Sequence, residues 1–188
     1  MLTNETLIAI KQRRSTRAFK DEQIKDDELQ AVIEAGTWAP SARNQQAWHF
    51  TVIQDKQVLT ALNQETKKAA LQLDNEYIRQ AASNENFNIF YGAPTLIVVS
   101  GDEKAMVIDF DCAAANQNML LAAHSVGLGS CWINFVMLLF NSPGGEKHIK
   151  QLGLPAGYKP YCSVALGYKK ADTAAAPPRK EGIVNYIR

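Results

Sequence analysis

The sequence predicts a single globular domain that combines helices with strands, and three observations support this. The chain has 188 residues, of which 46% are hydrophobic, enough for one sizeable core and too apolar for a disordered chain. The run Pro94–Val99 is continuously apolar and rich in β-branched residues, which predicts a buried strand. The segment 107–126 instead repeats its apolar residues at helical spacing. We therefore expect one α/β domain over residues 1–188.

The first third of the chain begins with helical patterns. Thr3 or Asn4 can cap a first helix, because either side chain accepts a hydrogen bond from a free backbone N–H. A second helix opens at Asp26, and Gly36 suits the left-handed position that ends a helix. In order, we expect a helix running into segment 11–17, a helix over 26–36, a loop over 38–48 and a strand over 49–53.

The remainder alternates in the same way. We first expect mostly helix over 56–82, a polar loop over 84–88 and a strand over 94–99 with its proline at the start. A helix over 107–126 and a turn leading into an irregular segment over 127–134 come next. We then expect a strand over 161–168 and a linker over 174–178. The tail 182–187 is apolar and strand-like, so it needs a surface on which to pack. A partner subunit is one such surface.

The helix expected over 107–126 is apolar on nearly all sides. Its 3-4-3-4 repeat is followed by Cys112, Ala115, Met119, Ala122 and Val126. A helix that is apolar nearly all round is buried, and its small residues allow a second helix to approach closely. The pattern fits the centre of the monomer core and the centre of a dimer equally well.

Composition excludes several classes of protein. The formal net charge of +1 gives no reason to expect a nucleic-acid partner. No stretch approaches the ~20 apolar residues of a membrane helix, and the N-terminus lacks the pattern of a signal peptide. The widely spaced Cys112, Cys131 and Cys162 form neither a disulfide framework nor a zinc motif, so we expect no metal site and a protein of the reducing cytoplasm.

Candidate binding residues occur near both ends of the chain. Arg13, Arg14 and Arg17 surround Ser15, which suits either a phosphate site or a solvated helix end. The loop 39–46 is dense in neutral hydrogen-bonding groups, as is expected of a polar ligand site or of ordinary turn chemistry. The pair Arg179 and Lys180 could return to a phosphate or lie in a solvated tail.

The remaining candidates are weaker. Gly127-Leu128-Gly129 lacks the third glycine of a dinucleotide fingerprint and follows a helix, so a Rossmann site is excluded. Cys131 has no local partner that would make it a nucleophile, and a buried structural cysteine is expected.

Four segments, in this order, resemble the nitroreductase family of FMN oxidoreductases. They are Arg13-Arg14-Ser15-Thr16-Arg17-Ala18-Phe19, then Ala39-Pro40-Ser41-Ala42-Arg43-Asn44-Gln45-Gln46-Ala47-Trp48-His49-Phe50, then Asp111 to Ala123 with Gly127-Leu128-Gly129-Ser130-Cys131-Trp132-Ile133, and finally Arg179. The resemblance extends from about residue 7 to residue 182. It departs from the family at Ala47, where proline is usual. It departs again at Pro177, where some members carry a lysine that Lys180 or Arg14 would have to replace.

The resemblance implies a three-layer α+β fold with a mixed, mainly antiparallel sheet, and an obligate homodimer with FMN at the subunit interface. Arg13, Ser15 and Arg179 would hold the phosphate, and Arg14 and Arg17 would lie along the ribityl chain or near the N1/O2 edge. Backbone groups around Ile133, Asn134 and Phe135 would face flavin N5 and O4. The other implied contacts are Asn86 at the pyrimidine edge and Pro40, Ser41, Ala42 and Asn44 from the other subunit.

The implied activity is hydride transfer from NADH or NADPH to flavin N5, then to an electron-poor small molecule such as a nitroaromatic or quinone. No catalytic side chain is expected, although Arg17 would tune the flavin by stabilising its reduced form. The short segment after Asn134 lacks the helices that larger relatives insert over the substrate pocket. Two alternatives are a non-catalytic FMN-binding or flavin-carrier protein and a specialised member that receives its electrons from ferredoxin.

Overall fold

The computed structural model describes residues 2–171 and 175–188. Its elements, in chain order, are α1 (Glu5–Gln12), α2 (Asp26–Thr37), the 3-10 turn η1 (Ala42–Asn44), β1 (Trp48–Ile53), α3 (Lys56–Leu71), α4 (Glu76–Ser83), β2 (Thr95–Asp102), α5 (Ile108–Ser125), β3 (Gly129–Trp132), α6 (Met137–Phe140), α7 (Glu146–Gln151) and β4 (Tyr158–Gly167). The expected helices and strands are therefore present, with the differences described below.

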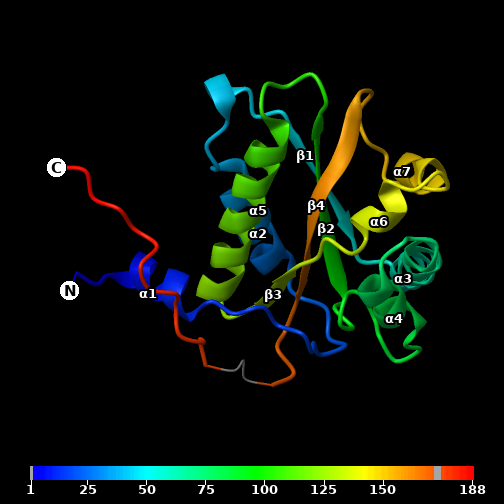
Figure 1. The fold of residues 1–188 in the computed structure, drawn as a ribbon, viewed down its shortest axis with the longest axis horizontal. Helices are drawn as coiled ribbons and strands as arrows, with labels where there is room; N and C mark the ends of the chain where they lie inside the picture. The colour runs from blue at the N-terminus through cyan, green and yellow to red at the C-terminus, as the bar shows by residue number, and fades with distance from the viewer. Residues whose placement is uncertain (1, 172–174) are drawn as a thin grey trace.

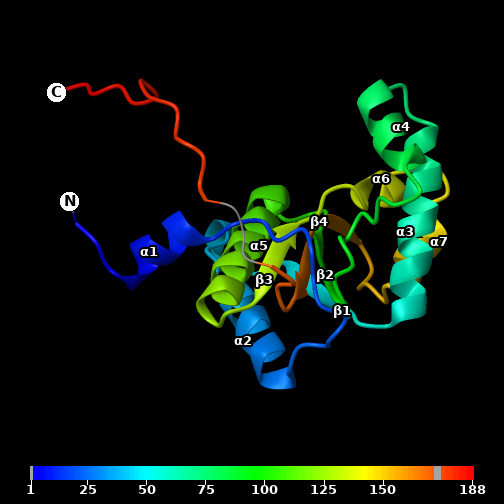
Figure 2. The same ribbon diagram turned by 90° about the horizontal axis from the view of Figure 1, so that it is seen from below.

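The four strands form one sheet in the order β1-β2-β4-β3, and each neighbouring pair is antiparallel. A parallel bridge between Ser15 and Ser130 adds to its edge. Helices α2 and α5 cover one face, while α3, α4, α6 and α7 lie on the other (Figures 1 and 2). This confirms the expected three-layer α+β fold.

Strand β2 is apolar throughout because both of its faces are covered. Leu96 and Val98 pack into the core beneath α3 and α6, whereas Ile97 and Val99 pack into the core beneath α2 and α5. All four side chains are fully buried. The period-2 alternation of a strand thus distributes one apolar run between two cores.

Helix α5 is central to the chain but keeps one exposed side. Cys112, Ala115 and Met119 are fully buried against the sheet, as their spacing predicts. Phe110, on another side of the same helix, is 70% exposed. The single chain therefore accounts for part of the apolar surface of α5 and leaves the rest uncovered.

The expectation that Gly36 ends the second helix is wrong. Gly36 lies inside α2, which continues to Thr37. A Cβ on Gly36 would lie 3.0 Å from Met119 Cγ and 3.2 Å from Phe50 Cζ. The glycine is therefore explained by the close approach of α5 and β1 and not by a left-handed backbone.

Two further expectations need correction, and one is confirmed in more detail. The segment after Gly127 is not wholly irregular, because residues 129–132 form β3 and pair with β4. The segment 56–82 is mostly helical, as expected, and it consists of two helices, because a break before α4 is capped by Asn75, whose side chain accepts from the Ile78 amide. The tail forms no strand in the described residues 175–188, and Ala174 of the expected linker lies outside the described residues.

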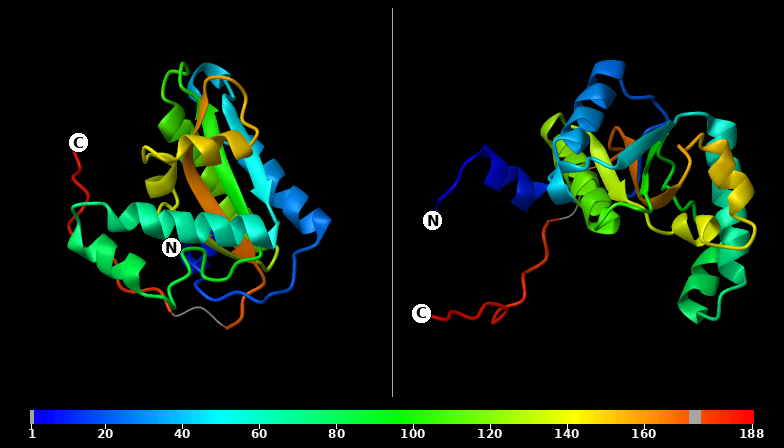
Figure 3. Two further views of the ribbon diagram at one scale, coloured as in Figure 1. Left: turned by 90° about the vertical axis from the view of Figure 1, so that its right-hand side faces the viewer. Right: turned by 90° about the horizontal axis from the view of Figure 1, so that it is seen from above.

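Helix α1 and the tail project from the side of the molecule that carries α2 and α5 (Figure 3). No residue of α1 is buried. In the tail, Ile183 is 75% exposed and Tyr186 is 74% exposed. Two apolar segments are thus left without a packing surface in the single chain. In the described part of the chain, no helix has the length and apolarity needed to cross a membrane.

Gly101→Ala is expected to destabilise the fold. A Cβ at this buried position of β2 would lie 2.2 Å from Ile108 Cγ1 and 2.4 Å from Ile108 Cδ1. Ile108 is itself buried and β-branched, so it cannot turn away freely. We expect a loss of about 1–3 kcal/mol in the free energy of unfolding, measured by urea denaturation. The matched control is Gly144→Ala, which meets no atom within 4 Å; equal urea midpoints for the two variants would contradict the prediction.

Candidate functional site

The arginine-rich segment after α1 is tied to the sheet by its backbone. The Thr16 amide donates to Ser130 O at 2.9 Å, beside the start of β3. Further along, the Lys20 amide donates to Tyr168 O at 2.9 Å, and Ala18 O accepts from the Lys170 amide at 3.1 Å. A Cβ on Gly129 would lie 2.8 Å from Thr16 Oγ1, so glycine at this position allows the close approach. These contacts hold the segment at one edge of the sheet.

A cavity of about 590 Å³ opens beside this segment. Arg13, Arg14, Ser15 and Arg17 line it, and so does Arg179 from the opposite end of the chain. The remaining lining residues are Thr16, Ala18, Ala171, Ala175 and Pro177. Lys180 is not among them. The structure thus brings together the five lining residues that the resemblance assigns to the phosphate and ribityl chain.

The cavity is strongly basic. Among the described residues, no carboxylate lies within ion-pairing distance of any of the four lining arginines. Burial, followed by repulsion from Arg14, lowers the pKa of Arg13. Burial also lowers the pKa of His124, at the end of α5, and Lys169, Arg13 and Arg14 add to that shift. A phosphate group would relieve this crowding of positive charge, so the residues present fit an anionic ligand.

Cys131 follows Ser130, the residue of β3 that bridges to Ser15. Its side chain is buried, as expected, and burial raises the pKa of its thiol. The nearby charge of Arg17, a hydrogen bond with the Ser15 side chain and the charge of Arg13 act in the opposite direction. Burial is the largest of these effects, so Cys131 is a protonated, structural thiol.

The segment after β3 offers backbone donors that are free in the described residues. The Ile133 amide donates to Ser163 O at 2.8 Å, and Ile133 O accepts from Ser163 Oγ at 2.7 Å. In contrast, the amides of Asn134 and Phe135 donate to no group in the described residues. The Asn134 side chain accepts from Trp132 Nε1 at 2.7 Å. Of the three backbone amides expected to face a flavin edge, those of Asn134 and Phe135 are therefore unpaired in the described residues, and that of Ile133 is paired.

An aromatic row connects Arg17 to this segment. The Arg17 guanidinium lies 5.9 Å from the centre of the Tyr91 ring. Tyr91 contacts Phe87 edge-on at 6.1 Å, and Phe87 contacts Phe135 edge-on at 5.6 Å. Asn86, the residue before Phe87, is exposed in this loop. The loop 84–91 therefore lies in the same region as Arg17 and Phe135.

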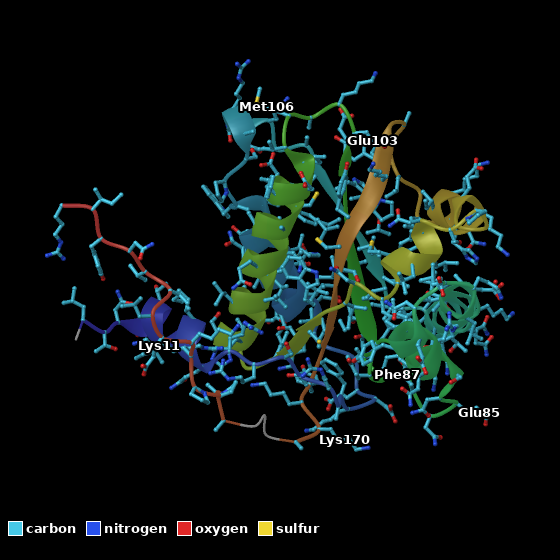
Figure 4. The ribbon with its side chains drawn as sticks, viewed as in Figure 1. Lys11, Glu85, Phe87, Glu103, Met106 and Lys170 are labelled. Carbon is cyan, nitrogen blue, oxygen red and sulfur yellow. The ribbon has the colours of Figure 1, made fainter. Side chains whose placement is uncertain are left out.

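The second motif lies at the other end of α5. The Ala42 amide donates to the buried Asp111 carboxylate in the first turn of α5, at 3.2 Å and 3.3 Å. Gln45 Oε1 accepts from the Met106 amide. Figure 4 shows Met106 at the upper end of the molecule and Lys11, next to the arginine segment, at the lower end. An α-helix of 18 residues is about 27 Å long, so one chain does not bring Pro40, Ser41, Ala42 and Asn44 to its own arginines.

Sequence reasoning missed several residues of the region. Lys169 and His124 add positive charge beside Arg13 and Arg14. Tyr91 and Phe87 form the aromatic row. Only the aromatic pair carried a signal, namely large rings within a short loop of amide side chains.

The fold and the cavity define an α+β protein with an arginine-lined site at one edge of its sheet. Comparison with known proteins specifies this class. The model of the nitroreductase family matches residues 10–168. A nitroreductase from Bacteroides fragilis, solved with bound FMN, is 38% identical, with a TM-score of 0.91 over 99% of this chain and 100% of that one.

Two other relatives agree. A nitroreductase from Desulfitobacterium hafniense, also with bound FMN, is 32% identical, with a TM-score of 0.89 over 100% of both chains. An FMN reductase [NAD(P)H] from Bacillus subtilis is 26% identical over 94% of this chain and 70% of its own length. The chain belongs to the nitroreductase family.

Proposed function

We propose that the protein is an FMN-dependent NAD(P)H oxidoreductase that acts as a cytoplasmic homodimer. The observation that carries the proposal is the cavity lined by Arg13, Arg14, Arg17 and Arg179, whose charges have no carboxylate partner among the described residues. Family relatives of known structure that hold FMN support it. FMN, when bound, would accept hydride from NADH or NADPH and reduce an electron-poor small molecule such as a nitroaromatic or quinone.

The chain's own residues divide the binding of FMN between them. Arg13, Ser15 and Arg179 hold the phosphate through charge-assisted hydrogen bonds. Arg14 lies along the ribityl chain, and Arg17 provides positive charge near the N1/O2 edge. The free amides of Asn134 and Phe135 donate to the N5/O4 edge, and Asn86 contacts the pyrimidine ring. No side chain of the protein is required to act as a general acid.

Each site needs a second subunit. Pro40, Ser41, Ala42 and Asn44 lie at the opposite end of α5 from the arginines of their own chain. In a two-fold dimer in which the α5 helices run antiparallel, the loop of one subunit meets the arginines of the other. The exposed side of α5, including Phe110, would lie in this interface.

The projecting segments supply further contact area. Ile8 and Ile10 of α1 are 42% and 50% exposed, and Ile187 in the tail is fully exposed. Packing them on a partner removes this apolar surface from water. The tail also carries Arg179, so docking the tail would fix that arginine at the phosphate.

The proposal is tested with the purified protein. We expect a yellow dimer that contains about one FMN per chain, as measured by absorbance and by sedimentation. In stopped-flow mixing, NADH or NADPH is expected to bleach the flavin absorbance, and a quinone or nitroaromatic is expected to restore it. A colourless protein that cannot be reconstituted with FMN would overturn the proposal.

The same experiment separates the alternatives. If reduced ferredoxin bleaches the bound FMN and neither NADH nor NADPH does so, the protein is the ferredoxin-fed member of the family. FMN that dissociates readily and reduces no acceptor indicates a flavin carrier. Either result would replace the NAD(P)H assignment while leaving the FMN site in place.

A further inference from the structure

The turn after the loop 84–88 contains an unusual backbone conformation. Tyr91 has φ +56° and is followed by Gly92 with φ +75°. Left-handed φ is common for glycine and asparagine, but it is a genuine outlier for a bulky aromatic residue. A strained backbone conformation of this kind persists only where the surrounding structure holds it in place, and such residues cluster at functional sites.

The surrounding structure does determine Tyr91. Phe90, the residue before it, is 2% exposed, and its amide donates to Asn88 Oδ1 at 2.8 Å. The Tyr91 amide donates to Asn88 O at 2.9 Å. Ala93, two residues later, is also buried, and its amide donates to Phe90 O at 3.1 Å. The turn is fixed on both sides, so the direction of the Tyr91 Cα–Cβ bond is fixed as well.

That direction places the ring against Arg17. The guanidinium lies 5.9 Å from the ring centre, within the range of a cation–π contact. Arg17 is exposed and makes no ion pair in the described residues. The Tyr91 ring is therefore the group that restricts a long, flexible and otherwise solvated side chain.

The Tyr91 ring also contacts a second aromatic ring. Phe87 contacts Tyr91 edge-on at 6.1 Å, and Phe135 contacts Phe87 edge-on at 5.6 Å. Figure 4 shows Phe87 at the lower right of the molecule and Lys170 at the bottom. The row joins Arg17 to the segment whose amides are proposed to face the other edge of the flavin.

We propose that Tyr91 is a positioning residue that holds the Arg17 guanidinium at the N1/O2 edge of the bound flavin and so helps to set the reduction potential. The positive charge stabilises the reduced cofactor only if it stays near that edge when reduction occurs. A guanidinium that rotates into solvent is screened by water and loses most of this effect. Because Arg17 faces FMN only in the proposed function, the role of Tyr91 depends on that proposal.

The test measures the midpoint potential of FMN in the holoprotein, using a reference dye at equilibrium. Tyr91→Leu removes the ring, and we expect the potential to fall by at least half of the shift caused by Arg17→Ala. Tyr91→Phe keeps the ring and is expected to retain the wild-type potential. In the double variant Arg17→Ala with Tyr91→Leu, we expect no fall beyond that of Arg17→Ala alone.

Two further variants separate positioning from stability. Tyr91→Gly removes the ring and relieves the left-handed strain, so we expect the fall in potential without a lower melting temperature. Tyr77→Leu removes a tyrosine of α4 that is 80% exposed, and we expect it to change neither the midpoint potential nor the melting temperature.

The outcomes distinguish the two proposals. A wild-type potential in Tyr91→Leu, together with a lowered one in Arg17→Ala, would overturn the role of Tyr91 and leave the FMN function intact. An unchanged potential in both would remove the tuning role of Arg17 and that of Tyr91 with it. A wild-type protein that binds no FMN would instead overturn the proposed function.

Discussion

Arg13→Ala is expected to weaken the affinity for FMN by about 10- to 100-fold. A hydrogen bond to a charged group contributes about 1.5–3 kcal/mol, and about 1.4 kcal/mol corresponds to a factor of ten in the dissociation constant. Arg13 caps the end of α1 through a bond from its amide to Ala9 O, so its backbone position does not depend on its side chain. The change would therefore remove the proposed phosphate ligand without moving the segment. Quenching of FMN fluorescence during titration of the apoprotein measures the loss.

Arg17→Ala provides the contrast, because Arg17 is proposed to lie at the ring and not at the phosphate. We expect the midpoint potential to fall by about 30–60 mV, since about 1.4 kcal/mol corresponds to about 30 mV for a two-electron couple. Retention of FMN is expected to change less than in Arg13→Ala. Arg79→Ala removes an arginine of α4 that pairs with Asp74, and it is the control for a general loss of positive charge. Equal losses of affinity in the Arg13 and Arg17 variants, with no change in potential, would contradict the division of roles.

Elements whose pattern is local could be predicted from the sequence. Strand β2 and helix α5 follow from the apolar run of one and the helical spacing of the other. Strand β3 has only four residues, and its existence depends on pairing with β4, which lies far along the chain. Gly36 gives the local signal of a helix end, yet its position is set by Met119 and Phe50. In both cases a tertiary contact outweighs the local pattern.

The candidate site likewise combines features that are local in the sequence with features that depend on tertiary contacts. The arginines and the serine of segment 13–17 are visible as a cluster, but nothing local joins them to Arg179 at the other end of the chain. Resemblance to a family supplied that connection, and the fold brings the two segments to one cavity. The hydrogen bond from the Ile133 amide to Ser163 O cannot be predicted from the sequence, because it arises from the pairing of segments on a folded sheet.

A mixed dimer is expected to recover an intact FMN site from two defective subunits. Ala42→Glu adds bulk and negative charge to the loop that the proposal assigns to the partner's site, and Arg13→Ala removes the proposed phosphate ligand. Each change alone, present in both subunits, damages both sites of the dimer. In a dimer of one Ala42→Glu subunit and one Arg13→Ala subunit, shared sites would concentrate both defects in one site and leave the other with neither.

We therefore expect the doubly tagged and purified mixed dimer to bind about one FMN per dimer with wild-type affinity, whereas the Ala42→Glu homodimer binds almost none. The physical reason is the position of the loop, which Asp111 holds at the end of α5 remote from the arginines of the same chain. If each site were instead built within one chain, every site in the mixed dimer would carry one defect. No tight site would then be recovered, and that result would rule out the exchange of loops between subunits.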